Sequence, residues 1–156
     1  MKDALFNAIR AGELAQVQHL LSENPELVKE TDARGSTPLL LATYYGHEGI
    51  TAAIIEKDDN LDRQDASGNT ALMGVCFKGY HNIASMLLEK GAQVNITNFN
   101  GATALIFAAT FGKADIVALL VEHGANPTIA DDKGNTAMDH AKMQGRTDIQ
   151  KLLASA

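Results

Sequence analysis

The stretch Asp65-Ala66-Ser67-Gly68-Asn69-Thr70-Ala71-Leu72-Met73 decides the fold, because its pattern returns along the chain at a fixed distance. Gly68 and Thr70 of this stretch recur every 33 residues in four copies, and a glycine that follows it, Gly79, recurs with the same step. The three series are Gly35, Gly68, Gly101 and Gly134; Thr37, Thr70, Thr103 and Thr136; and Gly46, Gly79, Gly112 and Gly145. A period of about 20 to 50 residues is typical of solenoid proteins, so each copy predicts one structural unit.

Apolar residues follow the same step, which indicates a core that continues from unit to unit. The repeated apolar positions are Leu39, Leu72, Leu105 and Met138, and further along Ile50, Ile83, Ile116 and Ile149. Ahead of them, Gly12 lies 34 residues before Gly46, so we interpret the first segment as a diverged unit with one inserted residue. The predicted units of this single domain are approximately 1–31, 32–64, 65–97, 98–130 and 131–156.

Each unit predicts a tight turn followed by two short helices. An acidic residue or asparagine opens the turn, and the glycine supplies the backbone freedom of a hairpin-like turn. The threonine stands where a helix N-cap belongs, and in the second unit Pro38 follows at the first helical position. The next glycine ends this helix, and a second helix carries apolar residues at helical spacing, as in Ile83, Met86 and Leu87. Helices this short are marginal in water on their own, so the units must stack.

This pattern resembles the ankyrin repeat, whose unit carries Asp-x-x-Gly-x-Thr-Pro-Leu-His, a glycine between two antiparallel helices, and Gly-Ala before the next turn. The corresponding stretches are 32–40, 65–73, 98–106 and 131–139, so the resemblance covers nearly the whole chain. It implies an all-α fold, an ankyrin-repeat solenoid of stacked helix-turn-helix units with hairpin-like turns. Five repeats are expected, including two caps.

The chain departs from the family pattern at three kinds of position. The proline is kept only at Pro38 and is replaced by Ala71, Ala104 and Ala137 elsewhere. The histidine after the leucine is replaced in every unit, by Leu40, Met73, Ile106 and Asp139, so the usual Thr-to-His side-chain bond is not expected. In the second unit Asp58-Asp59 replaces Gly-Ala. We expect Asp58 to adopt a positive φ at some energetic cost, and this junction to be the weakest seam of the stack.

Composition and charge narrow the classes of function. The chain has 156 residues, of which 46% are hydrophobic and 21% charged, as in an ordinary globular domain. Its net charge of −6 opposes binding to nucleic acid or to anionic membranes. The lone cysteine excludes an intrachain disulfide, so we expect a cytoplasmic protein. Polar residues at both ends of the repeat array lead us to expect a complete chain and a monomer.

By resemblance, the turn tips and the first helices form a concave surface that binds a partner protein or peptide. Five of the eight aromatic residues fall on this surface and not on the repeated core positions. The predicted partner-binding residues are Arg34, Ser36, Tyr44, Tyr45, Phe77, Lys78, Phe99, Asn100 and Phe111. The alternative is that the aromatic rings only pack against neighbouring units. The acidic balance of the chain favours a partner with some basic character.

Residues with catalytic or ligating chemistry give weaker hypotheses. The residues aligned with Cys76 are Thr43, Ala109 and Lys142, and two of the three are small, which favours a packed side chain over a nucleophile. The five histidines lack metal-ligand spacing, so we expect neither a metal nor a cofactor. We predict a non-catalytic protein-interaction module. Two alternatives stay open: a regulatory or assembly subunit permanently bound to an enzyme, and an enzyme with a small site near Asp139 and His140.

Overall fold

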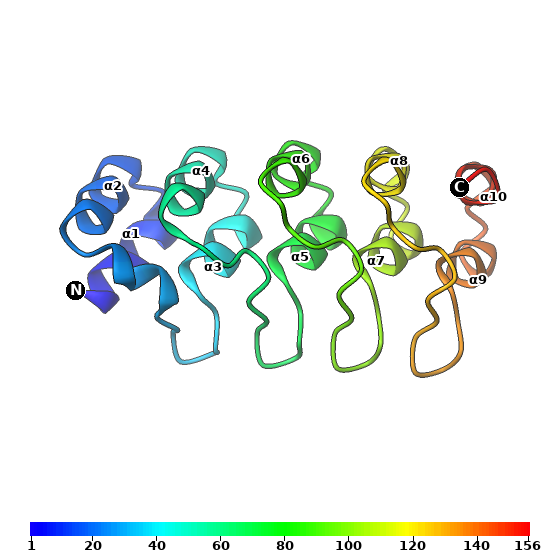
Figure 1. The fold of residues 1–156 in the computed structure, drawn as a ribbon, viewed down its shortest axis with the longest axis horizontal. Coiled ribbons are helices and arrows are strands. Elements are labelled where there is room, and N and C mark those ends of the chain that lie inside the picture. Colours follow the sequence, from blue (N-terminus) through cyan, green and yellow to red (C-terminus); the bar gives the residue numbers. More distant parts are fainter.

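The computed structural model describes all 156 residues, which form ten α-helices and one 3-10 helix and no strand. The elements are α1 (Lys2–Ala11), α2 (Leu14–Glu23), η1 (Pro25–Lys29), α3 (Pro38–Tyr44), α4 (Glu48–Lys57), α5 (Ala71–Lys78), α6 (His81–Glu89), α7 (Ala104–Thr110), α8 (Ala114–Glu122), α9 (Ala137–Met143) and α10 (Thr147–Ala154). Figure 1 shows these helices in pairs that stand in a row, with the connecting loops projecting together along one edge. The predicted all-α repeat solenoid is confirmed.

The helices form two layers along the row. The odd-numbered helices lie next to the projecting loops, and the even-numbered helices form the outer layer (Figure 1). Within the inner layer each helix contacts its counterpart in the next pair, α3 with α5, α5 with α7 and α7 with α9. The inner helices and the loops therefore make one continuous surface, on which equivalent positions of successive units lie side by side.

The core is one cluster of 38 buried apolar residues that runs the length of the stack. The repeated isoleucines Ile50, Ile83, Ile116 and Ile149 are all 3% exposed or less. Met138, in the last helix pair of the row, is only partly buried. Burying a side chain of this size contributes about 1.5–3 kcal/mol, so the repeated positions supply much of the stabilising free energy.

The recurring threonines cap the inner helices, as their position predicts. The hydroxyl of each accepts a hydrogen bond from the backbone N–H three residues later, over 3.2 to 3.3 Å. The recurring glycines that follow these helices all have positive φ, from 66° to 83°. The local signals in the sequence therefore predict where α3, α5, α7 and α9 begin and end.

The expected positive φ at Asp58 is wrong. Its φ is −96°, and the chain leaves α4 in an extended conformation. The side chain turns inward, where its Oδ1 accepts hydrogen bonds from Asn60 N–H at 3.0 Å and from Arg63 at 3.3 Å. Burial raises the pKa of Asp58, although these donors act in the opposite direction. The weakness of this junction stays a prediction.

The last unit replaces the missing Thr-to-His bond with a different one. The Asp139 carboxylate, at the position of the family histidine, accepts a hydrogen bond from the Thr136 hydroxyl at 3.1 Å and from the Thr136 N–H at 2.9 Å. An acceptor thus stands where the family has an imidazole. No helix in the chain combines the length and the apolar character needed to cross a bilayer.

Two glycine-to-alanine changes distinguish a glycine that a tight turn requires from a glycine inside a helix. Gly101 has a φ of +75°, and a Cβ there would lie 3.0 Å from the Asp132 nitrogen. Gly74 lies inside α5, and a Cβ there would meet no atom within 4 Å. We expect Gly101→Ala to lower the free energy of unfolding by more than about 1 kcal/mol, and Gly74→Ala to raise it by about 0.5–1 kcal/mol.

Urea unfolding followed by circular dichroism measures both changes. The two variants share the same chemistry, so each serves as the control for the other. Equal effects of the two substitutions would contradict this assignment of roles.

Candidate functional site

A groove with a volume of about 660 Å³ opens on the inner surface, between the second and third units. Its apolar wall includes Leu41, Tyr44, Phe77 and Phe107. Its polar wall is formed by turn residues: Asp32, Arg34, Ser36, Asp65, Ser67 and Asn69. Helices α3, α5 and α7 supply the first wall and the projecting loops supply the second, so the groove follows from stacking.

The groove exists because one inner-helix position has lost its side chain in the third unit. The equivalent residues of four successive units are Leu41, Gly74, Phe107 and His140. Leu41 and Phe107 line the groove on either side of Gly74, and the space above Gly74 is empty for at least 4 Å around its would-be Cβ. Comparison of residues at the 33-residue step could have found this glycine, which lies outside the three repeated series.

The predicted aromatic residues lie on the inner surface and stay accessible. Tyr44, Tyr45, Phe77, Phe99 and Phe111 are 42 to 67% exposed. Phe77 and Phe111 meet edge to face with their ring centroids 4.7 Å apart, so rings from neighbouring units do contact each other. A large part of each ring nevertheless stays accessible to solvent, so packing between units does not bury the aromatic surface.

The structure brings together some of the predicted site residues and not others. Arg34, Ser36, Tyr44, Tyr45 and Phe77 line the groove. The Nζ of Lys78 lies 4.4 Å from the ring centroid of Tyr44. Phe111 does not line the groove itself but packs against Phe77, which does.

Phe99 and Asn100 lie on the next loop and do not line the groove. Their backbones join neighbouring loops: Phe99 N–H donates to the Ser67 carbonyl at 3.1 Å, and the Asn100 carbonyl accepts from Asp132 N–H at 3.0 Å. These two residues therefore belong to the tips of the loops and not to the groove itself.

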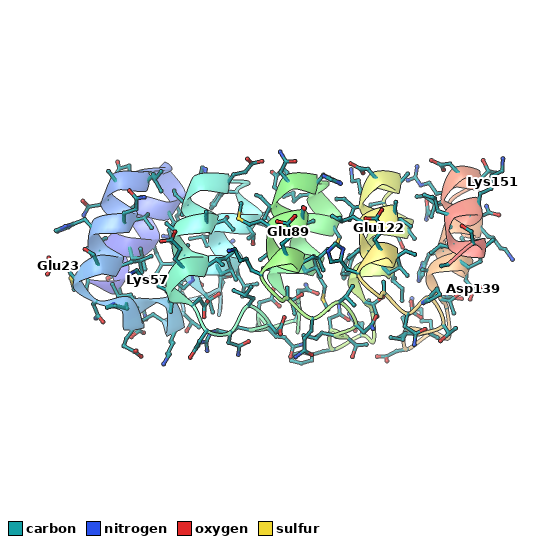
Figure 2. The ribbon with its side chains drawn as sticks, turned by 45° about the horizontal axis from the view of Figure 1, so that its top comes forward. Glu23, Lys57, Glu89, Glu122, Asp139 and Lys151 are labelled. Carbon is teal, nitrogen blue, oxygen red and sulfur yellow. The ribbon has the colours of Figure 1, made fainter.

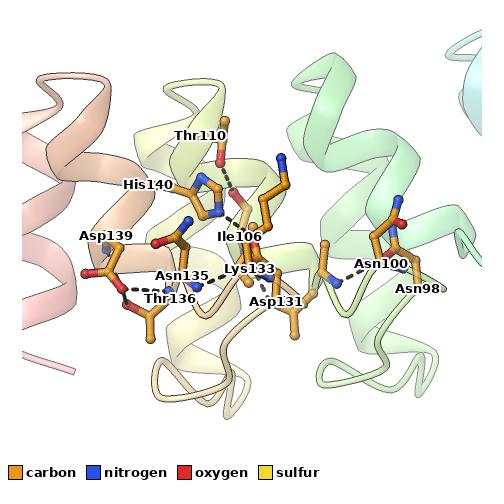
Figure 3. A network of polar contacts seen from close by, with 12 residues as sticks. Asn98, Asn100, Ile106, Thr110, Asp131, Lys133, Asn135, Thr136, Asp139 and His140 are labelled. Carbon is orange, nitrogen blue, oxygen red and sulfur yellow. Dashed lines mark hydrogen bonds and ion pairs between the residues drawn. The ribbon is translucent and has the colours of Figure 1, made fainter.

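The sequence neighbours Asp139 and His140 face different partners. Asp139 caps α9 through Thr136, whereas the Nε2 of His140 lies 2.8 Å from the Oδ2 of Asp131 (Figure 3). Hydrogen bonds from Thr136 lower the pKa of Asp139. Burial acts to raise the pKa of Asp131, but hydrogen bonds from the Asn135 N–H, the His140 ring and the Lys133 N–H outweigh it and lower the pKa. Both carboxylates hold the last loop to its helix, outside the groove.

The remaining reactive side chains offer no assembled site. Cys76 is fully buried, and burial raises the pKa of its thiol, so it stays protonated and out of reach of a substrate. No three His, Cys, Asp or Glu side chains come close enough together to hold a metal ion. The groove is thus the feature of the surface in which apolar walls and free polar groups meet.

Comparisons with known proteins agree with the architecture. A family model described as ankyrin repeats (3 copies) matches residues 5–98, and one described as ankyrin repeats (many copies) matches residues 87–141. The mouse (Mus musculus) protein "Ankyrin repeat and SAM domain-containing protein 6" is 34% identical over 60 residues. That match covers 38% of this chain and 7% of the mouse protein.

The capping role of Asp139 predicts a pH-dependent loss of stability. Because its pKa in the folded chain lies below the ordinary value of 3.8, its contribution is fully present above pH 3.8 and is lost as pH falls through the lower folded value. We expect Asp139→Ala to lower the melting temperature at neutral pH, with the gap from the unchanged protein closing in acid.

Thermal unfolding across the acid range measures that gap. Glu122→Ala is the matched control, since Glu122 is an exposed carboxylate on α8 without a hydrogen bond or ion pair. A gap for Asp139→Ala that stays constant through the titration would refute the role of its charge.

Proposed function

This chain belongs to the ankyrin-repeat family, and from that premise we propose that it is a non-catalytic module whose concave face binds a partner protein or peptide. Ankyrin repeats are generally protein–protein interaction modules. The observation that carries the proposal is the groove between the second and third units, which is walled by exposed aromatic rings on one side and by polar turn residues on the other.

Aromatic anchors support protein binding over small-molecule chemistry. Rings such as Tyr45, Phe77 and Phe111 bring large contact areas at low cost in conformational entropy, and residues of this kind dominate the binding energy of protein interfaces. They project from successive inner helices, so their spacing follows the repeat and suits an extended partner segment. The groove and the rings together form a strip that a peptide or a surface loop can occupy.

The proposed contact residues are those of the groove and of the loop tips next to it. Arg34, Ser36, Tyr44, Tyr45, Phe77 and Lys78 surround the groove, with Phe111 beside it, and Phe99 and Asn100 extend the surface along the loops. The net charge of −6 steers partners with basic character toward the chain, which affects the association rate more than the affinity.

The triple variant Tyr45→Ala, Phe77→Ala and Phe111→Ala tests the proposal. Each ring is 42 to 46% exposed, so its removal takes away partner contacts while most of the core stays intact. We expect the variant to keep its helical circular dichroism spectrum and to lose partner binding by at least about tenfold. Affinity capture from lysate of the native cells, followed by titration of the captured protein, measures the loss.

Glu122→Gln is the control, because it changes an exposed side chain of α8 in the outer layer. Figure 2 shows Glu122 on that layer together with Glu89 of α6. Partner capture that survives the triple variant, or that Glu122→Gln abolishes, would place the binding surface elsewhere.

A further inference from the structure

Three of the four loop turns are built around an aspartate in the same way. The Oδ1 atoms of Asp32, Asp65 and Asp131 each accept two backbone N–H groups, from the second and the fourth residue after the aspartate, at 2.9 to 3.0 Å. The fourth turn has Asn98 there, whose Nδ2 donates to the Asn69 Oδ1 at 2.9 Å. In each aspartate the turn uses Oδ1, which leaves Oδ2 for other partners.

Two of these three second oxygens already have a basic donor from the chain. The Oδ2 of Asp32 pairs with Arg10 of α1 at 3.3 Å. The Oδ2 of Asp131 pairs with the His140 ring at 2.8 Å, and Figure 3 shows this ring reaching from α9 toward the loop. Two different basic side chains thus satisfy the same oxygen of the same turn in two units.

The Oδ2 of Asp65, in contrast, accepts no hydrogen bond. The residue equivalent to Arg10 is Tyr44, and the residue equivalent to His140 is Gly74, so neither position carries a basic side chain here. Asp65 is half-buried and lines the groove together with Gly74. Where an imidazole lies above α9 in the last unit, the third unit has empty space above α5.

We propose that this space receives an arginine or lysine side chain of the partner, which lies over Gly74 and donates a hydrogen bond to the Oδ2 of Asp65. This inference rests on the proposed function and names the chemistry of the partner segment. Charge-assisted hydrogen bonds are about twice as strong as neutral ones, and the incoming cation would also meet the exposed rings of Tyr44 and Phe77.

The chain contains a precedent for the aromatic part of this contact. Lys78 already places its Nζ over the Tyr44 ring, at 4.4 Å from the centroid. Arg34 also lines the groove and makes no ion pair, so the groove presents one free charge of each sign. A segment with an acidic residue near its basic one therefore complements both charges.

An engineered donor tests the geometry without any partner. Gly74→His puts an imidazole at the position that His140 holds in the last unit, where it fits the empty space and can donate to Asp65. We expect the pKa of the introduced imidazole, measured by NMR titration, to be higher in Gly74→His than in the double variant with Asp65→Asn. Equal pKa values in the two variants would overturn the proposed geometry.

Selection from a random peptide library on the intact chain tests the partner chemistry. We expect enriched peptides to carry arginine or lysine beside a bulky apolar residue, and to bind at least about tenfold more weakly to Asp65→Asn and to Gly74→His. Glu122→Gln, which removes a carboxylate from the outer layer, is the matched control and should bind within about twofold of the unchanged chain.

The outcomes separate this inference from the proposed function. Peptides that depend on Tyr45, Phe77 and Phe111 but show no basic enrichment and no loss with Asp65→Asn would overturn the inference and leave the function standing. Selected peptides that are indifferent to the aromatic triple variant, or a selection that enriches none, would overturn both.

Discussion

Burial of apolar helix faces between neighbouring helix pairs is the interaction on which the rest of the structure depends. No helix is longer than ten residues, which is below the length at which isolated helices hold their structure in water. Ile83 and Ile116 are buried in the stack, and their helices α6 and α8 contact helices of the adjacent pairs as well as the other helix of their own pair. Because stability is supplied by these neighbour contacts, residues on the inner surface can differ from unit to unit without loss of the fold.

The inner surface uses that freedom to place different chemistry on one backbone. At a single repeated position, leucine and phenylalanine form walls, histidine ties a loop to its helix, and glycine leaves a hollow. The aspartates of the loops stay in place because each holds its own turn through one oxygen. The second carboxylate oxygen is available for other contacts. Its hydrogen-bond partner depends on which side chains stand at the neighbouring positions of the inner helices.

The sequence alone predicts features that depend on local chemistry and misses those that depend on contacts between units. Helix starts at Thr37 and Thr103 follow from capping, and helix ends follow from glycines with positive φ. The conformation of Asp58 could not be predicted from the sequence. Its side chain accepts hydrogen bonds from Asn60 and Arg63 while the backbone stays extended, so no positive φ is needed. The hollow above Gly74 depends on the side chains of two neighbouring units, and the pairing of His140 with Asp131 spans a loop and a helix.

Residue-resolved amide hydrogen exchange of the whole chain tests the central claim most directly. If neighbour contacts hold the stack together, the helices of the inner pairs, α3 to α8, have a neighbour on both sides and should show the strongest protection. Protection should fall toward α1 and α2 at one end and toward α9 and α10 at the other. Equal protection in all pairs, or a maximum at either end of the row, would contradict the claim that stacking stabilises these helices.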